Sequence, residues 1–196
     1  RLASLTRSGI AALAIVLILS VASSVATAQS LLVPMDDAQQ NHLKAYGLTF
    51  NALKAGNRAE WFINYRGGSF LLPDGQELRK TATLSGVTFE PLNNGRLAQI
   101  RAEIASGNMD AVTLEKAPRI AIYTPPKSPP WDDAVTLALR YAGIEYTTVW
   151  DDEVMNGDLQ KYDWLHLFHE DFTGQLNKLY LGFRDAPWFV EQRERN

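Results

Sequence analysis

The stretch RIAIYTPPKSPPWDDAVTLALRYAGIEYTTVW, residues 119–150, decides the fold. It begins with an apolar run at 119–123, which is typical of a buried strand, and continues through a proline-rich loop (TPPKSPP). Residues 131–142 then carry apolar side chains at helical spacing, and Gly143 ends the predicted helix before a second strand at 146–150. A strand, a helix and a second strand in this order predict an α/β unit.

The sequence after this unit continues the alternation. Residues 151–157 are polar and turn-like, and residues 164–168 (WLHLF) form a third apolar run. Helices that alternate with strands are typical of a parallel sheet covered by helices on both faces. We therefore predict that residues 117–196 form the start of a flavodoxin-like domain that is incomplete at its C-terminus.

The sequence before residue 117 shows a similar pattern. An apolar run at 31–35 (LLVPM) precedes a helical repeat of Leu43, Tyr46, Phe50 and Leu53. Further strands are predicted at 59–65 and 87–90, a turn at 66–68, and further helices at 76–85 and 97–105. We predict a first α/β half at 29–116 and a second at 117–196. The predicted fold class is thus α/β, with two successive flavodoxin-like halves that each have a parallel sheet in a three-layer (α/β/α) arrangement.

The composition excludes several classes of protein. The chain is 46% apolar and 21% charged, which is ordinary for a folded domain. Its net charge is -3, and its Lys and Arg residues are scattered, so we exclude nucleic-acid binding. The 196 residues include no cysteine, which excludes a disulfide, a thiolate metal site or a cysteine nucleophile within them.

Residues 1–28 have the features of a secretory signal peptide. A basic start that includes Arg1 precedes an almost purely apolar run at 10–21, and Ala26-Thr27-Ala28 is a small-x-small cleavage pattern. We expect cleavage before Gln29 and a periplasmic or cell-envelope location. The alternative is an uncleaved anchor, because apolar and small residues continue over about the length that spans a bilayer. Since the chain begins with Arg and not Met, we expect its natural start to lie upstream.

The carboxyl ends of the predicted strands are where parallel α/β sheets bind ligands. His169, Glu170 and Asp171 follow the strand at 164–168, and an imidazole beside two carboxylates can transfer protons or bind a divalent metal. We predict these three residues as catalytic candidates and leave the metal unassigned. His166 precedes His169 by three residues, so extended backbone places the two on opposite faces, and we interpret His166 as a sheet-face residue.

Other strand ends supply candidate ligand-binding residues. Backbone N–H groups of a glycine-rich turn can hold an anion, and acidic side chains after a strand can contact a polar ligand. The ligand-binding candidates are Asp36, Asp37, Arg66, Gly67, Gly68, Trp131 and Asp132. Carboxylates in a first helical turn after prolines, such as Asp132 and Asp133, also act as helix caps. We interpret the acidic run at 151–153 (DDE) as a solvated loop.

Four segments of the chain resemble exported bacterial proteins labelled asparagine synthetase B-like. The segments are 32–46 (LVPMDDAQQNHLKAY), 61–70 (WFINYRGGSF), 131–139 (WDDAVTLAL) and 162–175 (YDWLHLFHEDFTGQ). The label looks misleading, because this chain lacks the N-terminal cysteine nucleophile and the Ser-Gly-Gly-x-Asp-Ser loop of true asparagine synthetases. The resemblance implies a longer chain whose later part resembles a class I glutamine amidotransferase-like domain with a cysteine at a strand-to-helix turn. It also implies that these 196 residues supply only the opening of that domain and are inactive alone.

Two main functions remain open. The first is a periplasmic amidotransferase-like hydrolase whose nucleophile lies beyond residue 196. The alternative is a non-catalytic envelope binding or assembly module, which the aromatic residues Trp131, Trp150 and Trp188 favour. Carbohydrate or metal binding by the acidic loops ranks below both. The sequence identifies no cofactor, and the expected partners are a small molecule or an envelope protein, with membrane contact only through an uncleaved leader.

Overall fold

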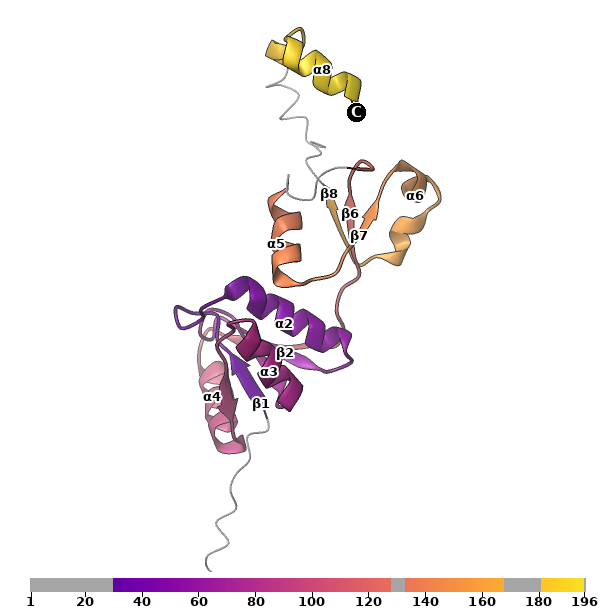
Figure 1. The fold of residues 1–196 in the computed structure, drawn as a ribbon. Coiled ribbons are helices and arrows are strands. Elements are labelled where there is room, and N and C mark those ends of the chain that lie inside the picture. Colours follow the sequence, from indigo (N-terminus) through magenta and orange to yellow (C-terminus); the bar gives the residue numbers. More distant parts are fainter. Residues whose placement is uncertain (1–29, 128–132, 168–180, 196) are drawn as a thin grey trace, which may run out of the picture.

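The computed structural model describes residues 30–127, 133–167 and 181–195, which form an α/β protein with two sheets (Figure 1). The predicted leader at 1–28 lies outside the described residues. Strands of the first sheet lie between Ser30 and Leu114, and the second sheet begins at Ile120. The α/β class agrees with the prediction, and the direction of the strands differs between the two sheets.

The first sheet is antiparallel. Its five strands have the order β4-β1-β3-β2-β5, and each of the four neighbouring pairs runs in opposite directions. The parallel, flavodoxin-like arrangement predicted for residues 29–116 is therefore wrong. The strands are β1 (Ser30–Val33), β2 (Ala59–Ile63), β3 (Ser69–Pro73), β4 (Glu90–Leu92) and β5 (Asp110–Leu114).

A tight hairpin between β2 and β3 explains the antiparallel direction. Asn64, Arg66, Gly67 and Gly68 all have positive φ angles, so the chain reverses over a few residues and β3 pairs directly with β2. Ser69–Pro73 (SFLLP) is a strand that was not predicted from the sequence. Because this strand returns beside β2, no helix connects the two, and a parallel pairing is excluded.

Helices cover both faces of the first sheet, as the three-layer prediction requires. Leu31 and Val33 point to one face, where they pack with Leu48 of α2, while Leu32 points to the other and packs with Ile100 of α4. This alternation along β1 buries both faces of the sheet. The helices are α2 (His42–Lys54), α3 (Gln76–Leu84) and α4 (Asn94–Ser106), with α2 and α3 sharing a face.

The second sheet is parallel, as predicted, with the order β7-β6-β8. Figure 1 shows α5 and α6 on opposite sides of this sheet. Gly143, with a φ of 75°, ends α5 in the left-handed conformation that favours glycine. The elements are β6 (Ile120–Tyr123), α5 (Ala134–Ala142), β7 (Thr147–Val149), α6 (Asp151–Met155), the 3-10 helix η2 (Asp158–Lys161) and β8 (Trp164–Leu167). The 3-10 helix η3 (Leu181–Phe183) and α8 (Pro187–Arg195) follow.

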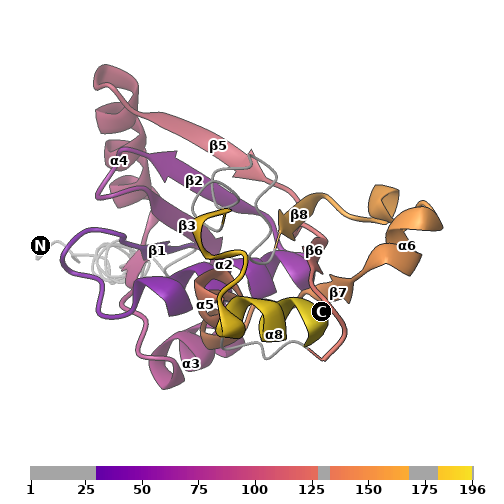
Figure 2. The ribbon, with the colours of Figure 1, turned by 90° about the horizontal axis from the view of Figure 1, so that it is seen from above.

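We call the antiparallel sheet with α2, α3 and α4 the first unit, and the parallel sheet with α5 and α6 the second unit. The two units pack together through α2 and α5, which lie side by side in Figures 1 and 2. Gly47 of α2 faces the backbone of Ala142, and a Cβ atom added to Gly47 would lie only 1.8 Å from the Ala142 carbonyl oxygen. The Asn51 side chain donates a hydrogen bond of 3.1 Å to the Gly143 carbonyl oxygen. A glycine is therefore required in the middle of α2 for the close approach of these helices.

Candidate functional site

The order of the parallel strands defines a switch point at their carboxyl ends. From the central strand β6 the chain crosses to β7 on one side, and from β7 it crosses to β8 on the other side of β6. Open α/β sheets bind ligands at such a switch point, outside the carboxyl ends of the strands where the connections diverge. The candidate site is therefore the region at the ends of β6 and β8, where His166 pairs with Asp133 and Thr124 directly follows β6.

His166 and Asp133 form a largely buried pair at this end of the sheet. His166 lies opposite Ile122 in the ladder, and its Nε2 lies 3.0 Å from Oδ2 of Asp133. The same oxygen accepts hydrogen bonds from the Thr136 backbone N–H (2.7 Å) and hydroxyl (2.8 Å). These contacts confirm His166 as a sheet-face residue and Asp133 as the cap of α5. The pairing of the two residues was not predicted.

Electrostatics fix the direction of the His166 hydrogen bond. Burial raises the pKa of the Asp133 carboxyl, but the hydrogen bonds from Thr136 and His166 outweigh burial and leave the pKa below its usual value. Asp133 is therefore ionised at neutral pH, and His166 Nε2–H is the donor. In the neutral imidazole, Nδ1 is then left as a hydrogen-bond acceptor.

Thr124 has a buried hydroxyl without a hydrogen-bond partner among the described residues. Its backbone N–H donates to the Val149 carbonyl oxygen at 3.0 Å, which continues the β6–β7 ladder by one residue. Extended backbone then places the Thr124 side chain on the same face as Ile122 and His166. A buried polar atom that lacks a partner is unfavourable, and it marks a position where a water or a ligand can bond.

On the opposite face, aromatic and acidic side chains gather behind the same strand ends. The Tyr123 ring stacks on Trp150 with a centroid distance of 4.6 Å, and its hydroxyl donates to Asp151 Oδ1 at 2.6 Å. The acidic run at 151–153 is the first turn of α6 and not a loop, which corrects the prediction. Acids are favoured there because they complement the positive end of the helix dipole.

The predicted anion-binding turn pairs with the predicted acidic residue beside it. Arg66 Nε donates to Asp36 Oδ2 at 2.7 Å, and its Nη1 donates to Glu90, a partner that was not predicted. The hydrogen bond from Arg66 lowers the pKa of Asp36, and those with Asp36 and Glu90 raise the pKa of Arg66. The structure thus brings Asp36 and Arg66 together in the first unit, where they hold the turn against the end of β1.

The glycines of this turn have a steric role. A Cβ atom added to Gly67, which has a φ of 79°, would lie 2.4 Å from the Met35 carbonyl oxygen. The Gly68 carbonyl oxygen accepts a hydrogen bond of 3.1 Å from the Trp61 indole N–H. Asp37 is exposed. Close approach to backbone explains the glycine at 67, and a φ of 92° explains the glycine at 68. Anion binding by this turn stays a prediction.

Five predicted residues lie outside the described part of the chain. Trp131 and Asp132 fall within 128–132, and His169, Glu170 and Asp171 fall within 168–180. Their roles therefore stay predictions. In sequence, the first segment ends next to Asp133, and the second begins directly after Leu167, the last residue of β8.

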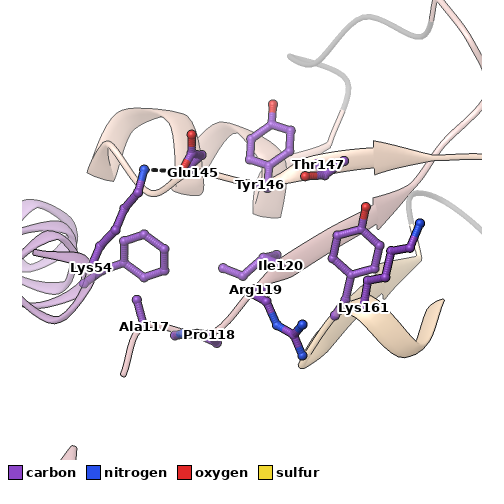
Figure 3. Close-up of a pocket in the computed structure, with 11 residues that line it drawn as sticks. Lys54, Ala117, Pro118, Arg119, Ile120, Glu145, Tyr146, Thr147 and Lys161 are labelled. Carbon is purple, nitrogen blue, oxygen red and sulfur yellow. Dashed lines mark hydrogen bonds and ion pairs between the residues drawn. The ribbon is translucent and has the colours of Figure 1, made fainter. Parts of the chain in front are cut away.

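The described residues also contain a cavity of about 320 Å³ at the other end of the parallel sheet (Figure 3). Residues that precede β6, β7 and β8 line it, together with Phe50 and Lys54 of α2. Within the ranges that the structure covers, no group of three or more His, Cys, Asp or Glu side chains is arranged to hold a metal ion. None of the helices described is long and apolar enough to cross a bilayer.

Comparison with protein-family models, curated proteins and solved structures finds no match to this chain. The class of protein that the observations define is a two-unit α/β protein. One unit is an antiparallel three-layer domain, and the other is a parallel unit with a polar switch-point site.

Proposed function

We propose that this chain is an exported protein whose second unit is the opening part of a class I glutamine amidotransferase-like hydrolase domain. The observation that carries the proposal is the parallel order β7-β6-β8 with polar groups of Thr124, Asp133 and His166 at its switch point. Flavodoxin-like sheets begin with this order and bind their ligands between the same two strands. The reaction site would lie at the carboxyl ends of β6 and β8.

The proposal assigns a role to each group near this edge. His169, Glu170 and Asp171 follow β8 and would supply the proton-transfer and charge-stabilising groups. Trp131 and Asp132 precede the cap of α5 and would contact the substrate. The 196 residues include no cysteine, so the thiol nucleophile of this class would come from residues beyond 196. The 196-residue chain alone would then be inactive.

The test compares the 196-residue chain with the chain extended along its own reading frame, using ammonia release from glutamine as the assay. We expect activity only in the extended chain, and only if it carries a cysteine on a Gly-flanked strand-to-helix turn. His169→Ala should reduce the rate by about 10²-fold or more, the usual contribution of a proton-transfer residue. His42→Ala is the matched control, because His42 lies on α2 and contacts the Met35 carbonyl oxygen. An equal loss of activity in His169→Ala and His42→Ala would contradict the role assigned to His169.

The proposed export has a separate test. Expression in a Gram-negative bacterium, followed by cell fractionation and N-terminal sequencing, should yield a periplasmic protein that begins at Gln29. A membrane-bound protein that retains residues 1–28 would support the anchor alternative. A cytoplasmic protein with an intact N-terminus would contradict export in either form.

A non-catalytic envelope module is the second candidate. Exposed aromatic side chains favour it: Trp61 is 39% exposed, Trp164 43% and Trp188 49%. Large exposed aromatics are enriched at protein interfaces. An extended chain without a nucleophile, or with an inert one, would favour this candidate over the hydrolase.

A further inference from the structure

The cavity at the amino ends of the parallel strands lies where the two units meet. Phe50 of α2 contributes from the first unit, Ile120 begins β6, and Tyr146 and Tyr162 come just before β7 and β8. Ligand sites occur preferentially at such junctions between units. The cavity is at the opposite end of the sheet from the switch point, so it is a separate site from the one proposed above.

Part of the lining of the cavity is aromatic and apolar. Phe50 and Ile120 belong to one buried cluster, and Tyr146 packs against that cluster as a partly buried neighbour. Tyr162 adds a second half-buried phenol ring. The volume of about 320 Å³ is at the small end of the range for ligand pockets. These surfaces suit a small flat ring and not a nucleotide.

Cationic side chains from three segments lie on the rim. In the view of Figure 3, Lys54 reaches from α2 to Glu145 on one side, Lys161 lies on the other, and Arg119 lies between them. Arg119 and Lys116 share a single carboxylate, Asp163, at 3.0 and 3.1 Å. The ion pairs around the cavity therefore join four cations (Lys54, Lys116, Arg119 and Lys161) to three carboxylates (Glu145, Asp158 and Asp163).

The two lysines on the rim are free to change partner. The Lys54 side chain is 52% exposed and that of Lys161 is 62% exposed, and exposed ion pairs of this kind are weak. Arg119 is held more firmly, because both its guanidinium and its backbone N–H donate to Asp163. An incoming anion can thus recruit the lysines without disturbing the contact that fixes β6 to the segment before β8.

We propose that this cavity binds a small amphipathic anion, a carboxylate attached to a single aromatic ring. The ring would lie against Phe50, Tyr146 and Tyr162, and the carboxylate would face the rim cations. Burial of a ring against aromatic side chains is favourable, and the excess positive charge selects the anion over its neutral analogue. The site would connect the two units, because its lining comes from both.

The test titrates benzoate into the ¹⁵N-labelled 196-residue chain and follows amide chemical shifts by NMR. Acetate supplies the anion without the ring, benzyl alcohol the ring without the charge, and inorganic phosphate a stronger anion without apolar surface. We expect saturable shifts at Thr147 and Arg119 with benzoate, and binding about tenfold weaker with each of the other three probes. Lys54→Gln and Lys161→Gln should each weaken benzoate binding about threefold, and the double variant about tenfold.

Lys80→Gln is the matched control, because Lys80 is an exposed lysine on α3 of the first unit. It should leave benzoate binding unchanged, and all variants should retain the circular dichroism of the parent. Absence of saturable benzoate shifts would overturn the proposal, as would equal weakening by the control variant. If phosphate or acetate bound as tightly as benzoate, the aromatic ring would contribute no affinity. That result would also overturn the proposal.

Discussion

The contact between Gly47 and Ala142 makes a sharp prediction about how the two units hold together. In Gly47→Ala, the new Cβ atom would lie 1.8 Å from the carbonyl oxygen and 2.8 Å from the carbonyl carbon of Ala142. Both are backbone atoms, so a side-chain rotation cannot relieve the overlap. The helices α2 and α5 must separate by roughly 1.7 Å to restore an ordinary contact of about 3.5 Å.

The expected cost follows from three effects. Overpacking of this kind costs about 1–3 kcal/mol, and loss of the Asn51–Gly143 hydrogen bond adds about 0.5–1.5 kcal/mol. Alanine is better than glycine within a helix by about 1 kcal/mol, which acts in the opposite direction. The free energy of unfolding should therefore fall by about 1–3 kcal/mol in Gly47→Ala.

Urea unfolding followed by tryptophan fluorescence measures this change. The matched control is Gly95→Ala in α4, where the added Cβ atom would meet only the Asn93 side chain, at an ordinary 3.4 Å. It should be neutral or stabilising by up to about 1 kcal/mol. If Gly47→Ala were as stable as Gly95→Ala, the close packing of α2 on α5 would be refuted as the contact that joins the units.

Three further predictions concern the turn and the switch-point site. Gly67→Ala should lower the free energy of unfolding by more than Gly56→Ala, because both have positive φ but only Gly67 faces backbone within 3 Å; urea unfolding of both variants compares them. The ionised Asp133 should contribute stability that is present above its unfolded pKa of about 3.9 and is lost as the pH falls through its lowered folded pKa. Unfolding measured from pH 7 to pH 2 should show this loss in the parent and a smaller one in Asp133→Asn, and identical pH profiles would contradict it. Thr124→Val should be neutral or stabilising by up to about 1 kcal/mol in thermal unfolding, because it removes a buried hydroxyl that has no partner among the described residues. A clear destabilisation would show that the hydroxyl is bonded.

The sequence predicted the second unit better than the first for a physical reason. Around β6 and α5, the apolar runs are separated by prolines and end at a glycine, so local signals mark each boundary. In the first unit, β3 (Ser69–Pro73) has four successive buried residues and therefore lacks the alternation that identifies a strand. The available signal was the double glycine at 67–68 between two apolar runs, which is typical of a hairpin.

The polar contacts also divide into residues that the sequence could identify and pairings that depend on the fold. Asp36 and Arg66 were each predicted as ligand-binding residues and not as partners; they meet because the antiparallel pair β1 and β3 places Val33 opposite Phe70 at their shared end. The His166–Asp133 pair was not predicted, because it joins residues 33 positions apart and depends on strand register and on the position of α5. Gly47 also escaped detection, since a glycine within a helical pattern does not identify the backbone that approaches it.

The length of α5 follows from what holds its two ends. At the start of the helix Asp133 contacts His166, and at its end Ala142 packs on Gly47. The nine helical residues therefore set the distance and the rotation between these two contacts. Inserting one residue would turn one end relative to the other by about 100° and lengthen the helix by about 1.5 Å. Both contacts could not then be kept, so the contacts at its two ends fix the number of residues in α5.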